Sequence, residues 1–272
     1  MNRPATSRRR RALGQHFLSN PAVAARIIDS FRPSPGDHVI EIGPGRGVLT
    51  GPLLERGARV TAIEVDPELA ADLTGRFGSE ERFLLIEADV LACDLGALAG
   101  PQGARVLANL PYSITGPVLV RLFGASERLT DMTVMLQREV VNRIVAAPGG
   151  RIYGSLSVLA QYFTEPRVVL SVGPGSFTPP PAVASTVVAM PFRANRELTP
   201  ALEKVYPSYV RMLFAHRRRT LANNLKAATH FPGAAAGHGD PIALLAKAGI
   251  DPARRPETLT RQEALRLFLT MV

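Results

Sequence analysis

The feature that most constrains this chain is a glycine-rich turn that directly follows a short apolar segment. His38–Ile42 is apolar enough for a buried strand, and it runs straight into Gly43-Pro44-Gly45-Arg46-Gly47. A helix is predicted next, over Val48–Arg56. Glycines between a strand and a helix let the backbone approach a ligand closely, because no Cβ stands in the way. The pattern therefore predicts a strand–turn–helix unit with a ligand at the turn.

The spacing of these glycines selects among ligands. A dinucleotide site has the pattern Gly-x-Gly-x-x-Gly, whereas here the third glycine is Gly47 and residue 48 is Val. Glu41 precedes the turn, and its carboxylate would repel a pyrophosphate. The sulfonium and ammonium groups of S-adenosylmethionine would not be repelled. The turn therefore favours S-adenosylmethionine as cofactor and a methyltransferase as the class of enzyme.

Short apolar strands alternate with helices as far as about residue 191. Asn20 and Pro21 are the expected cap and first residue of a helix before the sheet, and further helices are expected over Pro67–Arg76 and Arg138–Ala147. This alternation is typical of an α/β fold, a Rossmann-like, mostly parallel sheet with helices on both faces. The strands expected besides the first are Arg59–Glu64, Phe83–Ile86, Arg105–Ala108, Met132–Leu136, Val168–Val172 and Thr186–Pro191.

Polar side chains lie at the ends of four of these strands. They are Glu41, Glu64, Asp89 and Asn109. Ligands of such sheets bind beyond the carboxyl ends of the strands, so one crevice can collect all four. Glu64 could accept both ribose hydroxyls and Asp89 the adenine amino group. The alternative is that these are turn acids and helix caps, as Asp66 before Pro67 is expected to be.

Asn109-Leu110-Pro111-Tyr112 follows the fourth strand and suits the methylation of an exocyclic amine. The lone pair of adenine N6 is delocalised into the ring, so the nitrogen is a poor nucleophile. The Asn109 side-chain oxygen and the Leu110 carbonyl could accept its two N–H bonds and neutralise its developing positive charge. Tyr112 could stack on a base taken out of its helix. Alone, the tetrapeptide could equally be an Asn-Pro turn with a packed tyrosine.

Charge is concentrated at the two ends of the chain. The 272 residues carry a net charge of +9, and residues 1–12 hold five arginines and no acid. Beyond about residue 191 the pattern turns helical and basic, with a loop expected between Pro232 and Gly239 and helices over Ala201–Phe214, Arg219–Lys226, Pro241–Ala248 and Thr260–Leu269. Basic ends around a near-neutral middle favour a polyanionic partner, although a merely solvated surface is the alternative.

Other classes are disfavoured by composition. Cys93 is the single cysteine, which excludes an internal disulfide framework, and no metal site is expected. No apolar segment is long enough for a membrane helix, and no secretory signal is evident, so a cytoplasmic protein is expected. Aromatic residues are 6% with no tryptophan, so recognition of RNA should rest on shape and backbone.

Several motifs in order resemble those of the ribosomal small-subunit RNA adenine N6-dimethyltransferases, over nearly the whole chain. They are Leu13-Gly14-Gln15-His16-Phe17-Leu18, Val39-Ile40-Glu41-Ile42-Gly43-Pro44-Gly45, Asn109-Leu110-Pro111-Tyr112-Ser113-Ile114, Met135-Leu136-Gln137-Arg138-Glu139-Val140, Tyr153-Gly154-Ser155-Leu156-Ser157-Val158, Phe177-Thr178-Pro179-Pro180-Pro181 and Arg217-Arg218-Arg219-Thr220-Leu221. The resemblance implies transfer of four methyl groups to two adjacent adenosines in a hairpin near the 3′ end of 16S rRNA, within an assembling 30S subunit, by a monomer.

The resemblance also implies roles for particular residues. His16 and Leu18 would close over the cofactor, and Phe177 would stack on the target adenine opposite Tyr112. The remaining cofactor contacts would be Gly43, Gly45, Glu64, Asp89, Val90 and Asn109, and the RNA contacts Arg8, Arg9, Arg10, Arg11, Arg217, Arg218, Arg219 and Lys226. We expect a disordered basic arm over residues 1–12, a catalytic domain over 13–191 and a smaller helical RNA-binding domain over 192–272.

Two other functions stay open. A large-subunit 23S rRNA adenine methyltransferase of the macrolide-resistance type would share the cofactor turn, but the Gln137–Val140 segment and the sizeable C-terminal domain speak against it. A non-catalytic ribosome-assembly or RNA-binding factor would not need Glu64, Asp89 and Asn109 intact.

Overall fold

The computed structural model describes residues 16–227 and 240–272 and divides them between two compact units. The first unit comprises Met1–Val141 and Arg167–Phe192, and the second comprises Asn142–Pro166 and Arg193–Val272, in each case as far as the described residues go. The expected basic arm with Arg8–Arg11 and the expected loop Pro232–Gly239 lie outside the described residues. No helix in the described part is long and apolar enough to cross a membrane.

A seven-stranded sheet forms the first unit, in the order β4-β3-β2-β5-β6-β9-β7. The five strands from β4 to β6 are parallel, whereas β9 is antiparallel to both β6 and β7. Every strand expected from the sequence is present. The bounds are β2 His38–Ile42, β3 Arg59–Glu64, β4 Phe83–Glu87, β5 Ala104–Asn109, β6 Leu129–Gln137, β7 Arg167–Val172 and β9 Ser185–Pro191.

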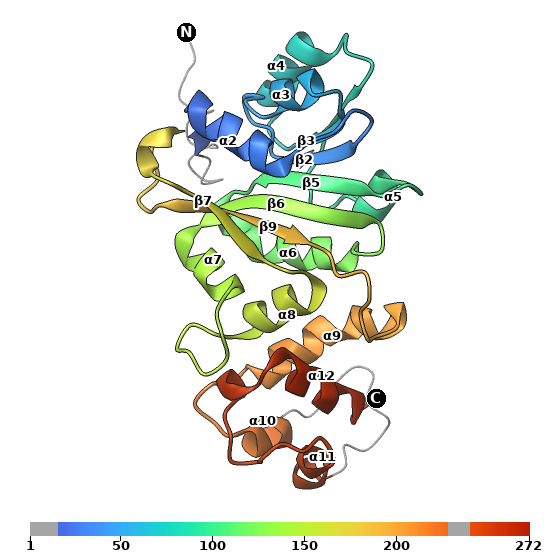
Figure 1. Cartoon of the computed structure of the whole chain (residues 1–272), viewed down its shortest axis with the longest axis vertical. Coiled ribbons are helices and arrows are strands. Elements are labelled where there is room, and N and C mark those ends of the chain that lie inside the picture. The colour runs from blue at the N-terminus through green and yellow to red at the C-terminus, as the bar shows by residue number, and fades with distance from the viewer. Residues whose placement is uncertain (1–15, 228–239) are drawn as a thin grey trace. The chain divides into compact units, whose positions relative to one another are not determined.

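Helices cover both faces of this sheet, as Figure 1 shows for α2 and α6. On one face, α2 packs Ile27 and Phe31 into a core that includes Val39 and Leu107 of the sheet. The neighbouring Ile40 is equally buried and points to the other face, because successive side chains of a strand alternate. The bounds are α2 Pro21–Phe31, α3 Thr50–Glu55, α4 Pro67–Phe77, α5 Leu95–Ala99, α6 Thr115–Gly124 and α7 Arg138–Ile144, the last of which runs from the first unit into the second.

Local capping explains where the helices begin. The Asn20 side chain accepts hydrogen bonds from the backbone N–H groups of Ala22 and Val23 at the start of α2. Asp66 does the same for Glu68 and Leu69 at α4, which confirms it as a helix cap. The sequence missed α5 and α6, and the expected helix over Val48–Arg56 is shorter, since α3 covers only Thr50–Glu55.

A small second sheet lies outside the main one. β1 (Phe17–Leu18) pairs antiparallel with β8 (Phe177–Thr178), so that Leu18 lies opposite Phe177. Two short 3₁₀ turns, η1 (Tyr112–Ile114) and η2 (Pro174–Ser176), follow β5 and β7. We call residues 16–18 the strap. The pairing joins the strap to a segment about 160 residues further along the chain.

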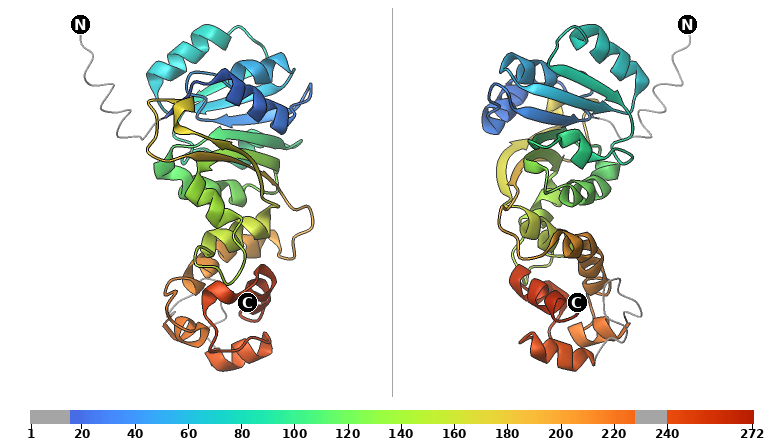
Figure 2. Two further views of the ribbon diagram at one scale, coloured as in Figure 1. Left: turned by 60° about the vertical axis from the view of Figure 1, so that its left-hand side comes forward. Right: turned by 90° about the vertical axis from the view of Figure 1, so that its right-hand side faces the viewer.

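The second unit is helical and has an aromatic core. The rings of Tyr162 and Tyr206 lie 4.8 Å apart, and those of Tyr206 and Phe268 lie 5.1 Å apart, all fully buried. Residues 142–166 belong to this unit, whereas we expected them in the catalytic domain that ends at residue 191. The elements, visible also in the turned views of Figure 2, are α8 Ser155–Phe163, α9 Pro200–Leu213, α10 Leu221–Ala227, α11 Pro241–Lys247, η3 Pro256–Thr258 and α12 Arg261–Leu269.

Gly47 is a position where the fold requires glycine. Its φ is +69°, and a Cβ there would lie 2.8 Å from Cε2 of Phe77 and 3.0 Å from Cδ2 of Leu73, both on α4. The last glycine of the turn therefore allows the helix α4 to pack close to the backbone.

We expect Gly47→Ala to lower the free energy of unfolding by about 1–3 kcal/mol, because a side chain would strain the backbone and meet α4. Gly75→Ala is the matched control: Gly75 is exposed within α4, and no described atom lies within 4 Å of a Cβ there. It should stabilise by roughly 0.5–1 kcal/mol, the ordinary gain of alanine over glycine in a helix. Urea unfolding of both variants checks this, and an unaltered midpoint for Gly47→Ala would contradict it.

Candidate cofactor and substrate site

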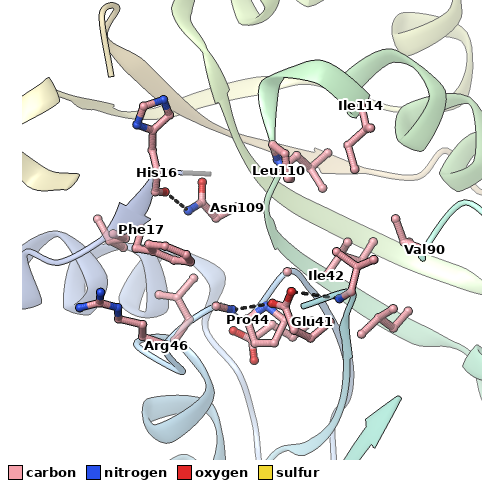
Figure 3. Close-up of a pocket in the computed structure, with 18 of the residues that line it drawn as sticks. His16, Phe17, Glu41, Ile42, Pro44, Arg46, Val90, Asn109, Leu110 and Ile114 are labelled. Carbon is pink, nitrogen blue, oxygen red and sulfur yellow. Dashed lines mark hydrogen bonds between the residues drawn. The ribbon is translucent and has the colours of Figure 1, made fainter. Parts of the chain in front are cut away.

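A pocket lies at the carboxyl ends of the parallel strands of the first unit (Figure 3). The four polar side chains expected to converge there all line it: Glu41, Glu64, Asp89 and Asn109. The expected contacts His16, Leu18, Gly43, Gly45, Val90, Leu110 and Tyr112 also line it. The parallel arrangement of β2, β3, β4 and β5 accounts for this, because it brings their carboxyl ends to one edge of the sheet.

The glycine turn forms one wall of the pocket. Gly43 and Gly45 have φ values of +68° and +57°. A Cβ on Gly43 would lie 3.5 Å from the main-chain oxygen of Asn109, and one on Gly45 would lie 3.0 Å from the Phe17 ring. Gly45 therefore permits the close approach of the strap, whereas at Gly43 it is the left-handed φ that favours glycine.

Glu64 joins the glycine turn to the end of β3. Its Oε2 accepts the N–H of Gly45 at 3.1 Å, and its Oε1 accepts the N–H groups of Val65 at 2.9 Å and Asp66 at 3.0 Å. Burial raises the pKa of this carboxyl, and the three backbone hydrogen bonds oppose that rise. A carboxylate offers about four acceptor positions, so Glu64 can accept ligand hydroxyls while it holds the turn.

Glu41 is buried beneath the turn, only 2% exposed, and its Oε2 accepts the hydroxyl of Thr50 at 2.7 Å. Burial, opposed by the Thr50 hydrogen bond and reinforced by the nearby Glu64 carboxylate, raises the pKa of Glu41 to about 7. Half of the side chains are therefore neutral near pH 7. A cationic ligand in the pocket would lower this pKa and favour the charged carboxylate. The sequence argument, which treated Glu41 as charged, therefore applies to the ligand-bound pocket.

Asp89 and Val90 form the wall that follows β4. Asp89 is exposed, and its Oδ1 accepts the N–H of Leu91 at 2.8 Å, so it closes a turn as the alternative interpretation proposed. In the described part of the chain no residue binds its other oxygen. Val90 is buried and lines the pocket. Asp89 thus closes a turn and also lines the pocket.

The strap orients Asn109 at the opposite wall. The Asn109 Nδ2 donates to the main-chain oxygen of His16 at 3.3 Å, as the dashed line in Figure 3 shows. The amide oxygen is then directed away from the strap. His16 is itself held, because its Nδ1 donates to the carbonyl oxygen of Pro179 at 2.8 Å. The side-chain oxygen of Asn109 and the main-chain oxygen of Leu110 therefore both lie at the end of β5, beside the glycine turn.

Tyr112 lies next to these acceptors. Its ring centroid is 5.6 Å from that of His16, with the planes tilted by 33°. Its hydroxyl is 2.9 Å from the hydroxyl of Ser185, the first residue of β9. Tyr112 thus presents a half-buried aromatic face to the pocket.

Phe177 is placed differently from the expectation. Its side chain is only 4% exposed and belongs to the hydrophobic core with Leu18, and it does not line the pocket. Stacking on a substrate base opposite Tyr112 therefore has no support from this structure. The reason is the β1–β8 pairing, which places Phe177 under the strap.

Some pocket residues were missed from the sequence. Phe17 lines the pocket, and the guanidinium of Arg46 lies 5.4 Å from its ring centroid. Val65 and Ile114 also line it. Val65 could have been found, because it follows Glu64 directly. Phe17 lies between His16 and Leu18, which only the family resemblance placed at the cofactor, and its contact with the glycine turn depends on the long-range pairing of the strap.

The basic residues near residue 217 lie in the second unit. Arg217 donates to the main-chain oxygens of Arg151 at 2.8 Å and Tyr153 at 2.9 Å, so its guanidinium holds a loop of its own unit. Arg218, Arg219 and Lys226 are exposed.

The sequence predicted the basic residues Arg217–Arg219 at the start of a helix. In the structure they lie in the turn before that helix. α10 begins at Leu221, two residues later than the helix expected from Arg219. Asn224 is only 2% exposed and closes the turn: it accepts the N–H of His216 and donates to the carbonyls of His216, Arg219 and Thr220.

Comparison with known proteins identifies the family of this chain. The model of the family described as ribosomal RNA adenine dimethylase matches residues 6–265. The chain belongs to this family. The ribosomal RNA small subunit methyltransferases A of Acinetobacter baylyi and Laribacter hongkongensis are each 41% identical to it, covering 97% and 95% of this chain and 92% and 94% of their own.

Two solved structures share the fold over both units. A dimethyladenosine transferase from Plasmodium falciparum superposes with a TM-score of 0.78 at 24% identity, covering 93% of this chain and 96% of its own. The 23S rRNA methyltransferase ErmE gives 0.68 at 25% identity, covering 94% and 99%. The C-terminal helical unit therefore does not separate the two substrate classes, contrary to the argument from the sequence.

Membership of the dimethylase family confirms the Rossmann-like fold and an S-adenosylmethionine-dependent methyltransferase activity. The donors and acceptors of the pocket suit that cofactor: a buried acid for its cationic end and strand-end acids for its adenosine. S-adenosylmethionine supplies an electrophilic methyl group, and the chain supplies the groups that hold it and the acceptor.

The raised pKa of Glu41 predicts a pH dependence of stability. The folded pKa of about 7 exceeds the ordinary value of 4.5, so the stability that the neutral side chain contributes is complete below about pH 4.5 and is lost as the pH rises through 7. Between pH 5 and pH 8, wild-type stability should fall by on the order of 2 kcal/mol relative to Glu41→Gln.

Urea unfolding of the cofactor-free protein at both pH values measures this difference. Glu55→Gln is the matched control, because Glu55 is exposed on α3 and its carboxyl is in water in both states. The two proteins could instead differ in free energy of unfolding by the same amount at pH 5 and at pH 8. That result would contradict a raised pKa of Glu41.

Proposed function

We propose that this protein transfers methyl groups from S-adenosylmethionine to N6 of two adjacent adenosines in a hairpin near the 3′ end of 16S rRNA. The observation that carries the proposal is the position of Asn109. Its Nδ2 is occupied by the His16 carbonyl, so its oxygen is available to the acceptor amine at the edge of the cofactor pocket. The small-subunit relatives at 41% identity support the choice of rRNA.

The proposed reaction needs two hydrogen-bond acceptors and one aromatic ring from these residues. The Asn109 oxygen and the Leu110 carbonyl would accept the two N–H bonds of adenine N6, which favours a pyramidal nitrogen with its lone pair free to attack. They would also neutralise the positive charge that develops as the C–N bond forms. Tyr112 would stack on the extruded base. The product proton is acidic enough to leave to water, so no general base is needed.

The cofactor would be held from three sides. The Glu41 carboxylate would face its cationic end, Glu64 would accept the ribose hydroxyls, and Asp89 would accept the adenine amino group. His16 and Leu18 of the strap would cover it, with Val90 against the adenine and Gly43 and Gly45 beneath. Of these acids, Glu41 and Glu64 are buried at 2% and 3% exposure, so a ligand there meets little competing water.

We also propose that the substrate is an assembling 30S subunit, that the enzyme acts as a cytoplasmic monomer, and that the second unit binds rRNA. Arg218, Arg219 and Lys226 are exposed cations that suit phosphate. Arg217 holds the loop containing Arg151 and Tyr153, so its contribution is to shape this basic surface. Arg8–Arg11, outside the described residues, would add to it.

The substrate is tested by incubating the protein with labelled S-adenosylmethionine and, separately, with unmethylated small subunits, intact ribosomes and large-subunit RNA. We expect dimethyladenosine in the small subunits alone. Dimethyladenosine only in large-subunit RNA would favour the macrolide-resistance type of enzyme, and no transfer to any RNA would favour a non-catalytic assembly factor.

The matched variant for this assay is Asn109→Ala, which should abolish transfer and leave cofactor binding nearly unchanged. Unchanged turnover of Asn109→Ala would remove Asn109 from the role proposed for it.

The RNA surface is tested by comparing a double variant, Arg218→Ala with Arg219→Ala, with the single variant Arg217→Ala. The double variant should weaken small-subunit binding and reduce the slope of log affinity against log salt by about 2, one for each phosphate that is no longer neutralised. Its thermal midpoint should not change. Arg217→Ala should lower the thermal midpoint, because it removes two hydrogen bonds to main-chain oxygens. An unaltered salt slope in the double variant would place the RNA elsewhere.

A further inference from the structure

Tyr112 is held at two points, by His16 of the strap and by Ser185 at the start of β9. Its ring contacts His16, whose Nδ1 donates to Pro179, and its hydroxyl meets the hydroxyl of Ser185 at 2.9 Å. Both anchors are outside the local turn η1 that carries Tyr112. A tyrosine held by its hydroxyl cannot swing about its Cα–Cβ bond without breaking that hydrogen bond.

Ser185 is a rigid anchor. It is 1% exposed and begins β9, where it pairs with Gln137 of β6 on one side and Val172 of β7 on the other. A residue with strands on both sides has little freedom to move. The hydroxyl of Ser185 therefore fixes the far end of the Tyr112 ring relative to the sheet, while the base of the ring is fixed to β5 through residues 109–111.

We propose that Ser185 is a positioning residue for methyl transfer: it fixes the far end of the Tyr112 ring, and thereby the tilt of the ring axis and of the adenine stacked on it. The inference rests on the proposed function, since it needs an aromatic acceptor on Tyr112. A stacked base follows the tilt of the ring beneath it, and its N6 must be presented in line with the methyl group within a fraction of an ångström. The acceptors at Asn109 and Leu110 receive the two N–H bonds only at the matching tilt.

The adjacent residue Thr186 provides a matched comparison. Its Oγ1 is also buried, but it has no hydrogen-bond partner among the described residues. Because side chains alternate along a strand, it points to the opposite face of β9. Both neighbours carry a buried hydroxyl; within the described part of the chain that of Ser185 bonds to Tyr112, and that of Thr186 bonds to no polar group.

The test compares Ser185→Ala, Thr186→Val, Tyr112→Phe and the double variant Ser185→Ala with Tyr112→Phe. One neutral hydrogen bond is worth roughly 0.5–1.5 kcal/mol, so Ser185→Ala should lower kcat on small subunits by about 3- to 10-fold. KM for the subunit and affinity for S-adenosylmethionine should not change, and the thermal midpoint should fall by only about 2–4 °C, which is what the loss of one hydrogen bond costs. Tyr112→Phe should match it, and the double variant should be no worse than either single variant. Thr186→Val should retain wild-type kcat.

Three outcomes would overturn the proposal: losses that multiply in the double variant, an equal loss in Thr186→Val, or a fall in cofactor affinity that accounts for the lower rate. A second measurement separates this result from a failure of the proposed function. With only five tyrosines in the chain, labelled tyrosine rings can be assigned by nuclear magnetic resonance. Ser185→Ala should weaken the nuclear Overhauser contacts between the rings of Tyr112 and His16 in the free protein, because the far end of the Tyr112 ring is released, and Thr186→Val should not, whether or not any RNA is methylated. Unaltered contacts in Ser185→Ala would contradict the anchoring itself.

Discussion

The cofactor pocket depends on the buried carboxylate of Glu64. A single side chain at the end of β3 accepts three backbone N–H groups, from Gly45 on the glycine turn and from Val65 and Asp66 beyond its own strand. These bonds fix the turn between β2 and α3 against the neighbouring strand. The shape of this wall of the pocket is therefore set by hydrogen bonds that need no ligand, and the same side chain lines the pocket.

The sequence predicted most of this wall because its determinants are local. These determinants are short apolar strands, glycines with a fixed spacing and a polar residue at each strand end. Each can be recognised from a few consecutive residues. The parallel arrangement then brings Glu41, Glu64, Asp89 and Asn109 together without further information. Helix starts were equally readable at Asn20 and Asp66, because a capping side chain and a proline at the first helical position act within three residues.

What the sequence could not predict depends on contacts between distant segments. The resemblance alone placed His16 and Leu18 at the cofactor, because the strap reaches the pocket through its pairing with β8, which also buries Phe177 and brings Phe17 over Gly45. The second unit takes up residues 142–166 because their aromatic side chains pack with those of α9 and α12, far along the chain. Arg217 looks like a free cation in a run of three, yet its guanidinium is bound to the loop at Arg151. No local pattern distinguishes these residues from their neighbours.

The hydrogen bond from Asn109 to the carbonyl of His16 has a consequence for the timing of the reaction. The strap, whose Phe17 ring lies against Gly45 of the glycine turn, also carries the oxygen that binds the Asn109 amide nitrogen. If the proposed function holds and the strap lifts to exchange spent cofactor, the amide would lose that partner and could rotate. An uncovered pocket and an unoriented amide would then be one state, and each return of the strap would restore the cover and the orientation together.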